Sequence, residues 1–327
     1  MRILTASDIA RLLPYSRCIG AMREVMQLTS ERAVVLPLRQ FMNVPDTAGK
    51  LGLMPGYVSR PAGFGVKIVS KFPRAPGAAH GSHVGAVLLF DAAEGLPLAL
   101  LDGGMLTAIR TASTTAMATD TLARADARAL LMVGCGEEAE HHLAALREVR
   151  AFDQLWVWGR DPGRAGVFAA RMSRRHGRPV EAVGDLAAAV PRADVICTVT
   201  SATTPILRGE WLRPGQHLNL VGAAIATSAE ADAEAVRRSR FYCDYRDAAL
   251  AAAGELLDAI RSGVVPETHL RGEIGEVLLG RIAGRESPDD LTLYKSLGVT
   301  SQDLAAAQIC YAAALEQGVG LDIELSD

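Results

Sequence analysis

Three small residues follow an apolar run in the middle of the chain. Gly134, Gly136 and Ala139 come directly after residues 130–133 (Leu-Leu-Met-Val), and a helical stretch begins behind them. The first glycine permits a tight turn, the second lets the backbone approach a pyrophosphate, and the alanine lets the helix pack close to its strand. Another apolar run, 154–158, follows the helical stretch as the next strand of a β-α-β unit should. The spacing therefore indicates a dinucleotide-binding turn.

The end of the second strand bears on the form of the cofactor. An acidic residue about 20 positions after such a turn normally accepts the ribose hydroxyls of NAD, but Gly159 and Arg160 stand here. Without a carboxylate nothing repels a 2′-phosphate, and a guanidinium can bind one with two hydrogen bonds. The pattern favours NADPH/NADP+, and Asp161 keeps NADH/NAD+ possible. Alternatively, Arg160 is a solvated loop arginine.

Two further strand ends carry small or hydroxyl-bearing residues. Residues 198–200 (Thr-Val-Thr) follow one apolar run and Gly222 follows another. The carboxyl ends of parallel strands lie at one edge of the sheet, so these residues are placed where cofactor and substrate meet. The residues expected to bind the cofactor are Gly134, Cys135, Gly136, Glu137, Glu138, Ala139, Gly159, Arg160, Thr198, Val199, Thr200 and Gly222.

Composition narrows the class of protein. The 327 residues are 49% hydrophobic with a net charge of -3, which disfavours disorder and nucleic-acid binding. No apolar stretch approaches the roughly 20 residues that cross a bilayer, and the first residues lack the core of a signal peptide, so a cytoplasmic location without membrane contact is expected. The five cysteines are scattered without C-x-x-C pairs, so neither a disulfide framework nor a metal site is expected.

Short apolar runs alternate with helical stretches in the middle of the chain, as in a parallel sheet covered by helices. The runs are 129–133, 155–158, 194–198, 217–221 and 241–243. Residues 34–101 are instead rich in Gly and Pro, with β-like runs such as 65–69 and 86–90, and an Ala- and Leu-rich helix follows at 303–317. The pattern predicts an α/β protein in which a parallel-sheet domain, 116–299, is inserted into a more antiparallel domain formed by 1–115 plus 300–327.

Six motifs spread over nearly the full length resemble, in order, those of the ornithine cyclodeaminase and mu-crystallin family. They are Leu53-Met-Pro-Gly-Tyr57, Gly65-Val-Lys67, Leu106-Thr-Ala-Ile-Arg-Thr-Ala112, Val133-Gly-Cys-Gly136, Ala193-Asp-Val-Ile-Cys-Thr-Val-Thr200 and Ser296-Leu-Gly-Val-Thr-Ser-Gln-Asp303. The resemblance implies a Rossmann-type domain inserted into a smaller α+β domain that dimerises and shapes the substrate site. It also implies a nicotinamide cofactor, with Thr111 among its contacts, a small amino or imino acid substrate and a homodimer.

Two departures from the family pattern bear on the reaction. Cyclodeaminases carry carboxylates at the positions of Gly52 and Ala224 in this chain. Cyclodeamination must shuttle protons between two nitrogens, and both groups suited to that task are missing. The reductive members need only orient the substrate and handle one proton, since the cofactor carries the hydride. We therefore expect reduction of the C=N bond of a small α-imino acid, or its reverse; the alternatives are an ornithine cyclodeaminase-type lyase and a non-catalytic protein that retains NADPH.

Four side chains match family positions that surround the substrate. Arg39, Lys67 and Arg110 correspond to residues that hold the substrate carboxylate and line its pocket, and a bidentate arginine would fix an α-imino acid flat against the nicotinamide. His83 aligns with a histidine of mu-crystallin-like members and could exchange a proton near neutral pH. Lys67 and His83 are the expected catalytic residues. Each of the four could instead be a structural or surface residue.

Four further residues are candidates for a role at the site or a position on the surface. Asp303 could line the substrate or nicotinamide site, or cap the last helix. Arg74 stands beside the position where many members carry asparagine, and could pair with a second carboxylate of a dicarboxylic imine. His141 and His142 are expected on the solvated face of the helix behind the glycine-rich turn.

Overall fold

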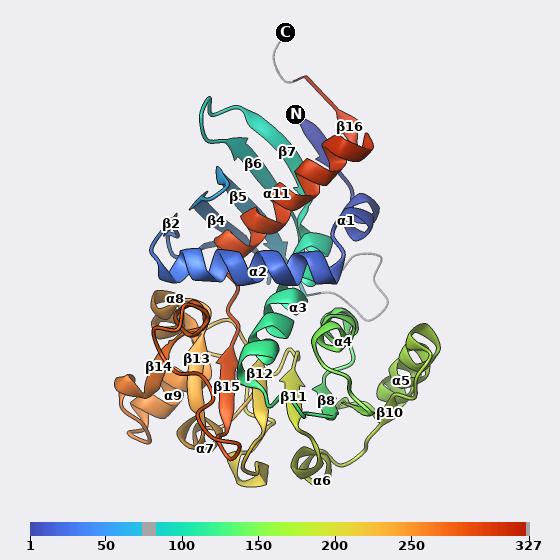
Figure 1. The fold of residues 1–327 in the computed structure, drawn as a ribbon, viewed down its shortest axis with the longest axis vertical. Coiled ribbons are helices and arrows are strands. Elements are labelled where there is room, and N and C mark those ends of the chain that lie inside the picture. The colour runs from blue at the N-terminus through green and yellow to red at the C-terminus, as the bar shows by residue number, and fades with distance from the viewer. Residues whose placement is uncertain (74–82, 325–327) are drawn as a thin grey trace. The chain divides into compact units, whose positions relative to one another are not determined.

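The computed structural model describes residues 1–73 and 83–324, with the side chain of His83 left out. The chain divides into two compact units, Met1–Thr111 with Val299–Asp327, and Ala112–Gly298. Helix α3 (Gly103–Leu122) begins in the first unit and ends in the second. The second unit is thus an insertion, and the predicted α/β class with a parallel-sheet domain inserted into an α+β domain is confirmed (Figure 1).

The first unit is built on a mixed eight-stranded sheet, in the order β16-β1-β7-β6-β5-β4-β2, with β3 also paired to β4. Its central strands are antiparallel, and only β1 and β7 run parallel. The strands are β1 (Arg2–Leu4), β2 (Val34–Val35), β3 (Gln40–Asn43), β4 (Lys50–Ser59), β5 (Ala62–Lys71), β6 (His83–Asp91), β7 (Pro97–Asp102) and β16 (Leu321–Asp322). The expected β-runs at 65–69 and 86–90 lie within β5 and β6.

Three helices belong wholly to this unit: α1 (Ala6–Leu12), α2 (Tyr15–Ser30) and α11 (Thr300–Gln317). Helix α11 packs against β4, β5 and α2, and it buries a row of small and branched side chains that includes Leu304, Ala307 and Cys310. Glycines permit this close packing, since a Cβ at Gly65 would lie 2.9 Å from the side chain of Leu304. The same face of β5 carries Lys67, so the helix that forms the core also covers the lysine.

The other face of this sheet keeps apolar side chains exposed. The register aligns Leu53 with Ile68, and it places Met42 and Val84 on that same face, opposite to Lys67. Their exposed fractions are 58% for Met42, 37% for Leu53, 38% for Ile68 and 41% for Val84. Monomeric proteins seldom leave a contiguous apolar surface of this kind open. We call these four residues the open sheet face.

The second unit is built on eight parallel strands, in the order β10-β9-β8-β11-β12-β15-β13-β14. The strands are β8 (Ala129–Val133), β9 (Gln154–Trp158), β10 (Glu181–Ala182), β11 (Val195–Thr198), β12 (His217–Leu220), β13 (Arg240–Cys243), β14 (Leu270–Glu273) and β15 (Thr292–Lys295). The first five in sheet order match the doubly wound dinucleotide-binding arrangement. The apolar runs expected as strands all coincide with strands, whereas β15 was not foreseen and enters between β12 and β13.

Helices cover this sheet on both faces (Figure 1). They are α4 (Glu137–Val149), α5 (Pro162–His176), α6 (Leu186–Ala189), α7 (Ala233–Arg238), α8 (Arg246–Ala252), α9 (Gly254–Arg261) and α10 (Ile274–Leu278). Short 3-10 turns lie at 190–192, 209–211 and 267–269. Helix α5 is typical in its ends: Asp161 caps it, Pro162 opens it and Gly177 closes it in the left-handed conformation.

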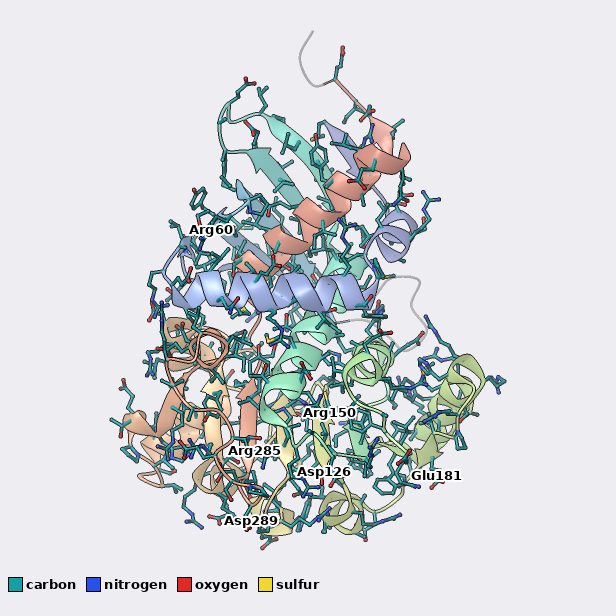
Figure 2. The ribbon with its side chains drawn as sticks, viewed as in Figure 1. Arg60, Asp126, Arg150, Glu181, Arg285 and Asp289 are labelled. Carbon is teal, nitrogen blue, oxygen red and sulfur yellow. The ribbon has the colours of Figure 1, made fainter. Side chains whose placement is uncertain are left out.

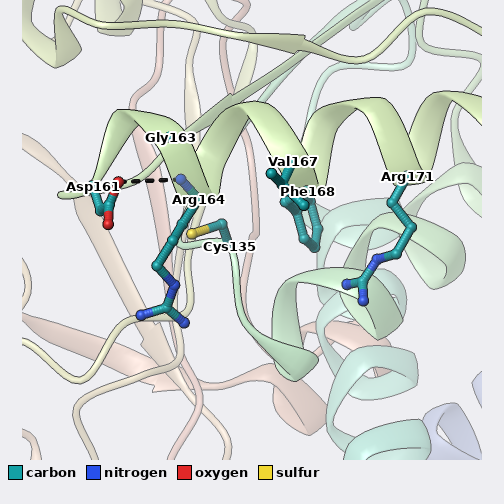
Figure 3. Close-up of a pocket in the computed structure, with 7 residues that line it drawn as sticks. All are labelled: Cys135, Asp161, Gly163, Arg164, Val167, Phe168 and Arg171. Atoms are coloured by element: carbon teal, nitrogen blue, oxygen red, sulfur yellow. Dashed lines mark hydrogen bonds between the residues drawn. The ribbon is translucent and has the colours of Figure 1, made fainter. Parts of the chain in front are cut away.

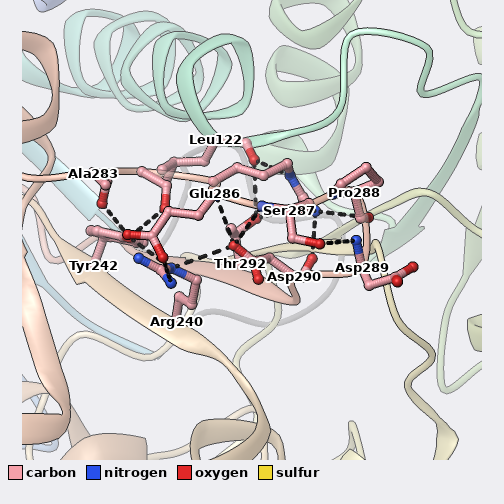
Figure 4. A network of polar contacts seen from close by, with 12 residues as sticks. Leu122, Arg240, Tyr242, Ala283, Glu286, Ser287, Pro288, Asp289, Asp290 and Thr292 are labelled. Atoms are coloured by element: carbon pink, nitrogen blue, oxygen red, sulfur yellow. Dashed lines mark hydrogen bonds and ion pairs between the residues drawn. The ribbon is translucent and has the colours of Figure 1, made fainter.

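Polar contacts fix the segment that leads into β15. The hydroxyl of Tyr242 donates to the carbonyls of Ala283 and Gly284, and Arg240 pairs with Glu286 (Figure 4). At the end of α4, Arg150, labelled in Figure 2, pairs with Asp120 on α3, with its Nη1 2.6 Å from Asp120 Oδ1. No helix in the described part of the chain is long and apolar enough to cross a membrane.

Candidate functional site

A buried cluster of charges lies in the first unit. Lys67 on β5, Arg110 on α3 and Asp303 on α11 have exposed fractions of only 5%, 4% and 0%. Arg110 Nε donates to Asp303 Oδ1 at 2.8 Å, and Lys67 Nζ lies 3.4 Å from the same oxygen. Three residues from distant parts of the sequence therefore meet at one carboxylate oxygen, and the prediction that they share a site agrees with this geometry.

The strand register of Lys67 and the position of Asp303 in its helix explain why these side chains lie together. Lys67 stands across from Met54 on β4 and Val87 on β6, on the face that α11 covers. Asp303 lies in the first turn of α11, where negative charge is favoured by the helix dipole. Val299, not Asp303, is the N-cap, so the capping role considered for this aspartate is wrong.

Burial changes the acidity of the lysine. Loss of solvent lowers the pKa of Lys67 from its ordinary 10.5 to about 8; Asp303 opposes the shift, and the positive charges of Arg110 and Arg39 add to it. A lysine with a pKa near 8 can release and recover a proton close to neutral pH. The second oxygen of Asp303, Oδ2, is buried and accepts no hydrogen bond from the described residues. The cluster thus offers a proton donor and an open acceptor a few ångströms apart.

Gln302 holds the arginine and was not singled out from the sequence. Arg110 Nη1 donates to Gln302 Oε1 at 2.7 Å, and the Gln302 amide nitrogen contacts Met26 Sδ at 3.4 Å. With Nε on Asp303 and Nη1 on Gln302, the plane of the guanidinium is fixed in advance of any ligand. The neighbouring pair Gln302-Asp303 in the last motif was the signal that could have revealed this role.

Of the other residues expected around the substrate, the structure describes Arg39 fully, the backbone of His83, and no part of Arg74. Arg39, directly before β3, is partly exposed, and its charge lowers the pKa of both Lys67 and Lys71. His83 opens β6, but its side chain lies outside what the structure describes, as does the whole of Arg74. The roles expected for His83 and Arg74 therefore remain predictions.

The position of Gly52 is packed against apolar groups. Gly52 lies on β4 two residues before Met54, so it faces the same side of the sheet as Lys67. A Cβ at this position would lie 2.9 Å from both Phe41 Cε1 and Val69 Cγ1. A longer acidic side chain at this position would need both neighbouring side chains to move.

In the second unit, the glycine-rich turn has the expected geometry. Gly134 has a φ of +124°, which only glycine adopts without strain, and its N–H donates to the carbonyl of Trp158 at 2.8 Å. Gly136 is the N-cap of α4, and a Cβ there would meet no atom of the described residues within 4 Å. Ala139 is fully buried against the sheet. Since protein packing does not require glycine at 136, the open space beside its backbone fits a ligand that approaches closely, as a pyrophosphate does.

A groove lies beside this turn. It has a volume of about 460 Å³ and is lined by Cys135, Asp161, Gly163, Arg164, Val167, Phe168 and Arg171 (Figure 3). The Asp161 carboxylate is engaged in capping α5, accepting from the N–H of Arg164 at 3.1 Å. Arg171 pairs with Glu140 at 2.8 Å. Within the described chain no ion pair engages Arg160 or Arg164, and both are exposed.

The remaining cofactor candidates divide into exposed and buried groups. Glu137 is exposed and Glu138 partly exposed in the first turn of α4, whereas Gly159 and Thr111 are buried. His142 is fully buried, with its ring nitrogens near Thr115 Oγ1 and the carbonyl of Glu138, so the surface position expected for it is wrong. It supports α4 from within.

Thr198, Val199, Thr200 and Gly222 do lie at the carboxyl ends of β11 and β12, as expected. Their polar groups, however, are largely bound to one buried carboxylate that sequence reasoning missed, Glu230. Among the described residues, no group of three or more His, Cys, Asp or Glu could hold a metal ion.

Known proteins are similar to this chain over nearly its full length. Residues 1–318 match the profile of the ornithine cyclodeaminase/mu-crystallin family. A Δ1-pyrroline-2-carboxylate reductase of Bacillus cereus is 31% identical over 325 residues, 99% of this chain and 100% of that protein, and the ketimine reductase mu-crystallin of Mus musculus is 36% identical over 278 residues, 85% of each. The structure of Thermococcus litoralis Δ1-pyrroline-2-carboxylate reductase in complex with NADH and L-proline superposes with a TM-score of 0.95 at 32% identity, covering 99% of this chain and 100% of that one.

Proposed function

Because the chain belongs to the ornithine cyclodeaminase/mu-crystallin family, we propose that it is an oxidoreductase that reduces the C=N bond of a small α-imino acid with a nicotinamide dinucleotide. The observation that carries this proposal is the buried cluster of Lys67, Arg110 and Asp303. Relatives named as reductases of a cyclic imino acid and of ketimines support the same reaction class. The product is the corresponding amino acid.

Lys67 is the proposed proton donor. Reduction of an imine needs one proton at nitrogen, and a lysine with a pKa of about 8 is protonated at neutral pH yet gives up its proton readily. Asp303 Oδ2 is buried and accepts no hydrogen bond from the described residues, so it is suited to accept one from the N–H of the substrate nitrogen. The two groups together would hold the nitrogen of the substrate and supply its proton.

Arg110 and Arg39 are the proposed ligands of the substrate carboxylate. The guanidinium of Arg110 is fixed by Asp303 and Gln302, so it can orient an anion without further loss of side-chain freedom. Arg39 adds positive charge to the same region, as its effect on Lys67 indicates. Gly52 argues against the cyclodeaminase reaction, because it supplies no carboxylate to shuttle a second proton and apolar side chains pack against its position.

The nicotinamide dinucleotide would be held by the second unit. Bound there, it supplies the hydride. The turn at Gly134 and Gly136 would bind the pyrophosphate through the N-terminus of α4. The residues after β11 and β12 would receive the nicotinamide half, and the doubly wound strand order supports this assignment.

We propose a preference for NADPH over NADH. The carboxylate of Asp161 caps helix α5, Arg164 lines the groove, and Arg160, which directly precedes Asp161, is exposed. Titration of the protein with NADP+ and NAD+, followed by cofactor fluorescence or calorimetry, tests this. An Arg160→Ser, Arg164→Ser variant should lose affinity for NADP+ by about tenfold or more and keep its affinity for NAD+. Equal affinity of the wild type for both cofactors would contradict the preference.

We also propose a homodimer formed through the open sheet face. Met42, Leu53, Ile68 and Val84 leave a row of apolar side chains in solvent, and a second copy of the chain would cover it. Light scattering of the purified protein should give twice the monomer mass. Ile68→Lys should shift the mass toward the monomer, and a monomeric wild type would exclude this assembly.

The central experiment follows oxidation of NADPH and NADH in the presence of Δ1-pyrroline-2-carboxylate, its six-membered homologue, and 2-oxo acids with ammonia. Turnover with any of these imines supports the proposal, and the best substrate defines the pocket. L-ornithine is assayed in parallel for release of ammonia. Ammonia release without net change of cofactor would contradict the proposal and would mean that other groups replace the carboxylates absent at Gly52 and Ala224.

A further inference from the structure

One buried carboxylate binds the ends of two central strands in the second unit. Glu230, in the segment before α7, is completely buried. Its Oε1 accepts from the N–H and the hydroxyl of Thr200, each at 2.7 Å. Its Oε2 accepts from Thr198 Oγ1 at 2.8 Å, from Gly222 N–H at 2.7 Å and from Ala223 N–H at 3.3 Å. All five partners donate, which is the arrangement that an ionised carboxylate requires.

The partners of Glu230 belong to two separate loops. Thr198 and Thr200 stand at the end of β11, while Gly222 and Ala223 follow β12, the neighbouring strand. The loops touch as well, since a Cβ at Gly222 would lie 2.0 Å from the carbonyl oxygen of Thr200. Gly222 is therefore a glycine because two backbones approach one another there, a reason that the sequence did not reveal.

The backbone of Glu230 is anchored in turn. Its N–H donates to Glu255 Oε1 at 3.0 Å, and its carbonyl accepts from the N–H groups of Ile206 and Leu207, both at 2.9 Å. Glu255 itself forms a fully buried ion pair with Lys295 on β15. The backbone of Glu230 is thus tied to two further segments, and its carboxylate holds the two loops together through the five hydrogen bonds described above.

We propose that Glu230 is the positioning residue of the nicotinamide site: it sets the loops after β11 and β12 so that they can receive the nicotinamide half of the cofactor. The inference rests on the proposed function only for the identity of that ligand. By strand order these two loops serve the nicotinamide half, whereas the turn after β8 and the groove beside α5 serve the adenosine half. Glu230 acts on the ligand through Thr200 and Gly222 and does not itself contact it.

Substitution of Glu230 by glutamine tests the role with little change in shape. Each carboxylate oxygen accepts at least one backbone N–H, so wherever the amide nitrogen of glutamine is placed, a backbone N–H of Thr200 or of Gly222 loses its acceptor. The hydroxyl groups can rotate away, but the N–H groups cannot. We expect one of the two loops to shift.

The measurement compares a whole cofactor with half of it. In Glu230→Gln, the dissociation constant of the dinucleotide, measured by calorimetry, should rise about tenfold or more, while that of 2′,5′-ADP or ADP, which lack the nicotinamide half, should stay within about twofold. Loss of affinity for both ligands alike would overturn the proposal and reduce Glu230 to general support of the fold. Unchanged affinity for both would overturn it also.

A matched control lies at the opposite edge of the same sheet. Asp194 accepts from the N–H groups of Arg128 at 2.8 Å and Ala129 at 3.0 Å, and so holds the amino ends of β8 and β11. Asp194→Asn loses the charge that pairs with Arg124 at 2.9 Å, although its remaining oxygen can still accept both N–H groups, and it should lower the melting temperature without any difference between dinucleotide and fragment. If Glu230→Gln does not fold, Thr200→Val keeps the backbone contacts of the Glu230 carboxylate and removes the hydroxyl, which also accepts from the N–H of Ala202 at 3.2 Å, and the same selective loss, smaller in size, is expected.

The outcome separates this inference from the proposed function. A wild-type protein that binds the dinucleotide but reduces no imine contradicts the proposed reaction, while the selective loss of affinity in Glu230→Gln still supports the positioning role. A wild-type protein that reduces imines while Glu230→Gln keeps full dinucleotide affinity contradicts the positioning role alone. Failure of the wild type to bind any nicotinamide dinucleotide overturns both.

Discussion

The two units offer different kinds of chemical groups for the roles proposed for them. In the first unit the groups are charged side chains, Lys67, Arg110 and Asp303, which are buried and paired with one another. In the second unit they are backbone N–H groups and small residues, and the nearby carboxylate of Glu230 is turned toward the protein. The first arrangement depends on proton affinity and charge, and the second on backbone conformation. Substitutions in the first unit should therefore alter turnover, and those in the second should alter cofactor affinity.

The largest effect is expected from Lys67→Met. Removal of the proposed proton donor should lower kcat for imine reduction by about 10²- to 10⁴-fold and leave the dissociation constant of the dinucleotide unchanged. Steady-state kinetics and cofactor titration measure the two quantities. Lys71→Met is the matched control, because Lys71 lies on the same strand and is exposed. An equal loss of kcat in the control would show that positive charge matters and the Lys67 proton does not.

The pH profile is the next test. The buried Lys67 has a pKa lowered to about 8, so it is protonated below this pH and loses its proton above it. Since the reduction uses the protonated form, kcat/KM should be flat below about pH 8 and then fall about tenfold per pH unit, with the fall absent in Lys67→Met. Between pH 8 and 10 the loss amounts to about 50-fold. A rate that rises through this range would exclude Lys67 as the acid.

Arg110→Lys should act mainly on substrate binding. A lysine keeps the charge, but all its N–H groups are on one nitrogen and it has no planar fork to reach Asp303 and Gln302 from two nitrogens, so the plane that orients the substrate carboxylate is lost. We expect KM for the imino acid to rise about tenfold or more, with a smaller fall in kcat. The exposed Arg60→Lys, which pairs only with Glu31 in the described structure, provides the control. A change in cofactor affinity with an unchanged KM for the imino acid would contradict the assignment of substrate binding to the first unit and cofactor binding to the second.

The smallest effect is expected from Gly134→Ala in the second unit. Alanine is strained at a φ of +124°, and its Cβ would lie 3.0 Å from the Val199 carbonyl oxygen. Dinucleotide affinity should fall several-fold to about tenfold, with little change in kcat at saturating cofactor. Gly177→Ala is the control: its φ is +62° and its surroundings are empty, so it should cost about 1 kcal/mol of stability and no affinity. Equal affinity loss in both variants would point to general destabilisation.

The sequence predicted what depends on local spacing. The glycine-rich turn and the strands around it were found because their signals lie within about thirty consecutive residues, and Lys67, Arg110 and Asp303 because they stand in family motifs. The α/β class with an inserted parallel-sheet domain is confirmed. The insertion of β15 between β12 and β13 could not be predicted, since strand order depends on tertiary packing that short apolar runs do not encode.

Glu230 was missed for a related physical reason. It stands in a polar segment, Ser228-Ala-Glu-Ala-Asp232, whose composition is that of an ordinary surface loop. Only the folded structure shows that the glutamate is buried while Asp232 serves as the cap of α7. His142 was misjudged in the same way, since its polarity suggested solvent and a hydrogen bond from Thr115 made burial possible.

The ion pair between Lys67 and Asp303 spans 236 positions of the chain, and this bears on how the protein is made. On the ribosome, Lys67 and Arg110 emerge long before Asp303, and all the strands of the inserted unit are synthesised in between. The first unit meanwhile lacks α11, so the face of β4 and β5 that this helix covers is bare, and Lys67 on β5 and Arg110 on α3 lack their acidic partner. The inserted unit can fold during this interval, and the charged cluster forms last. The nascent chain therefore needs protection from aggregation during the interval before α11 appears.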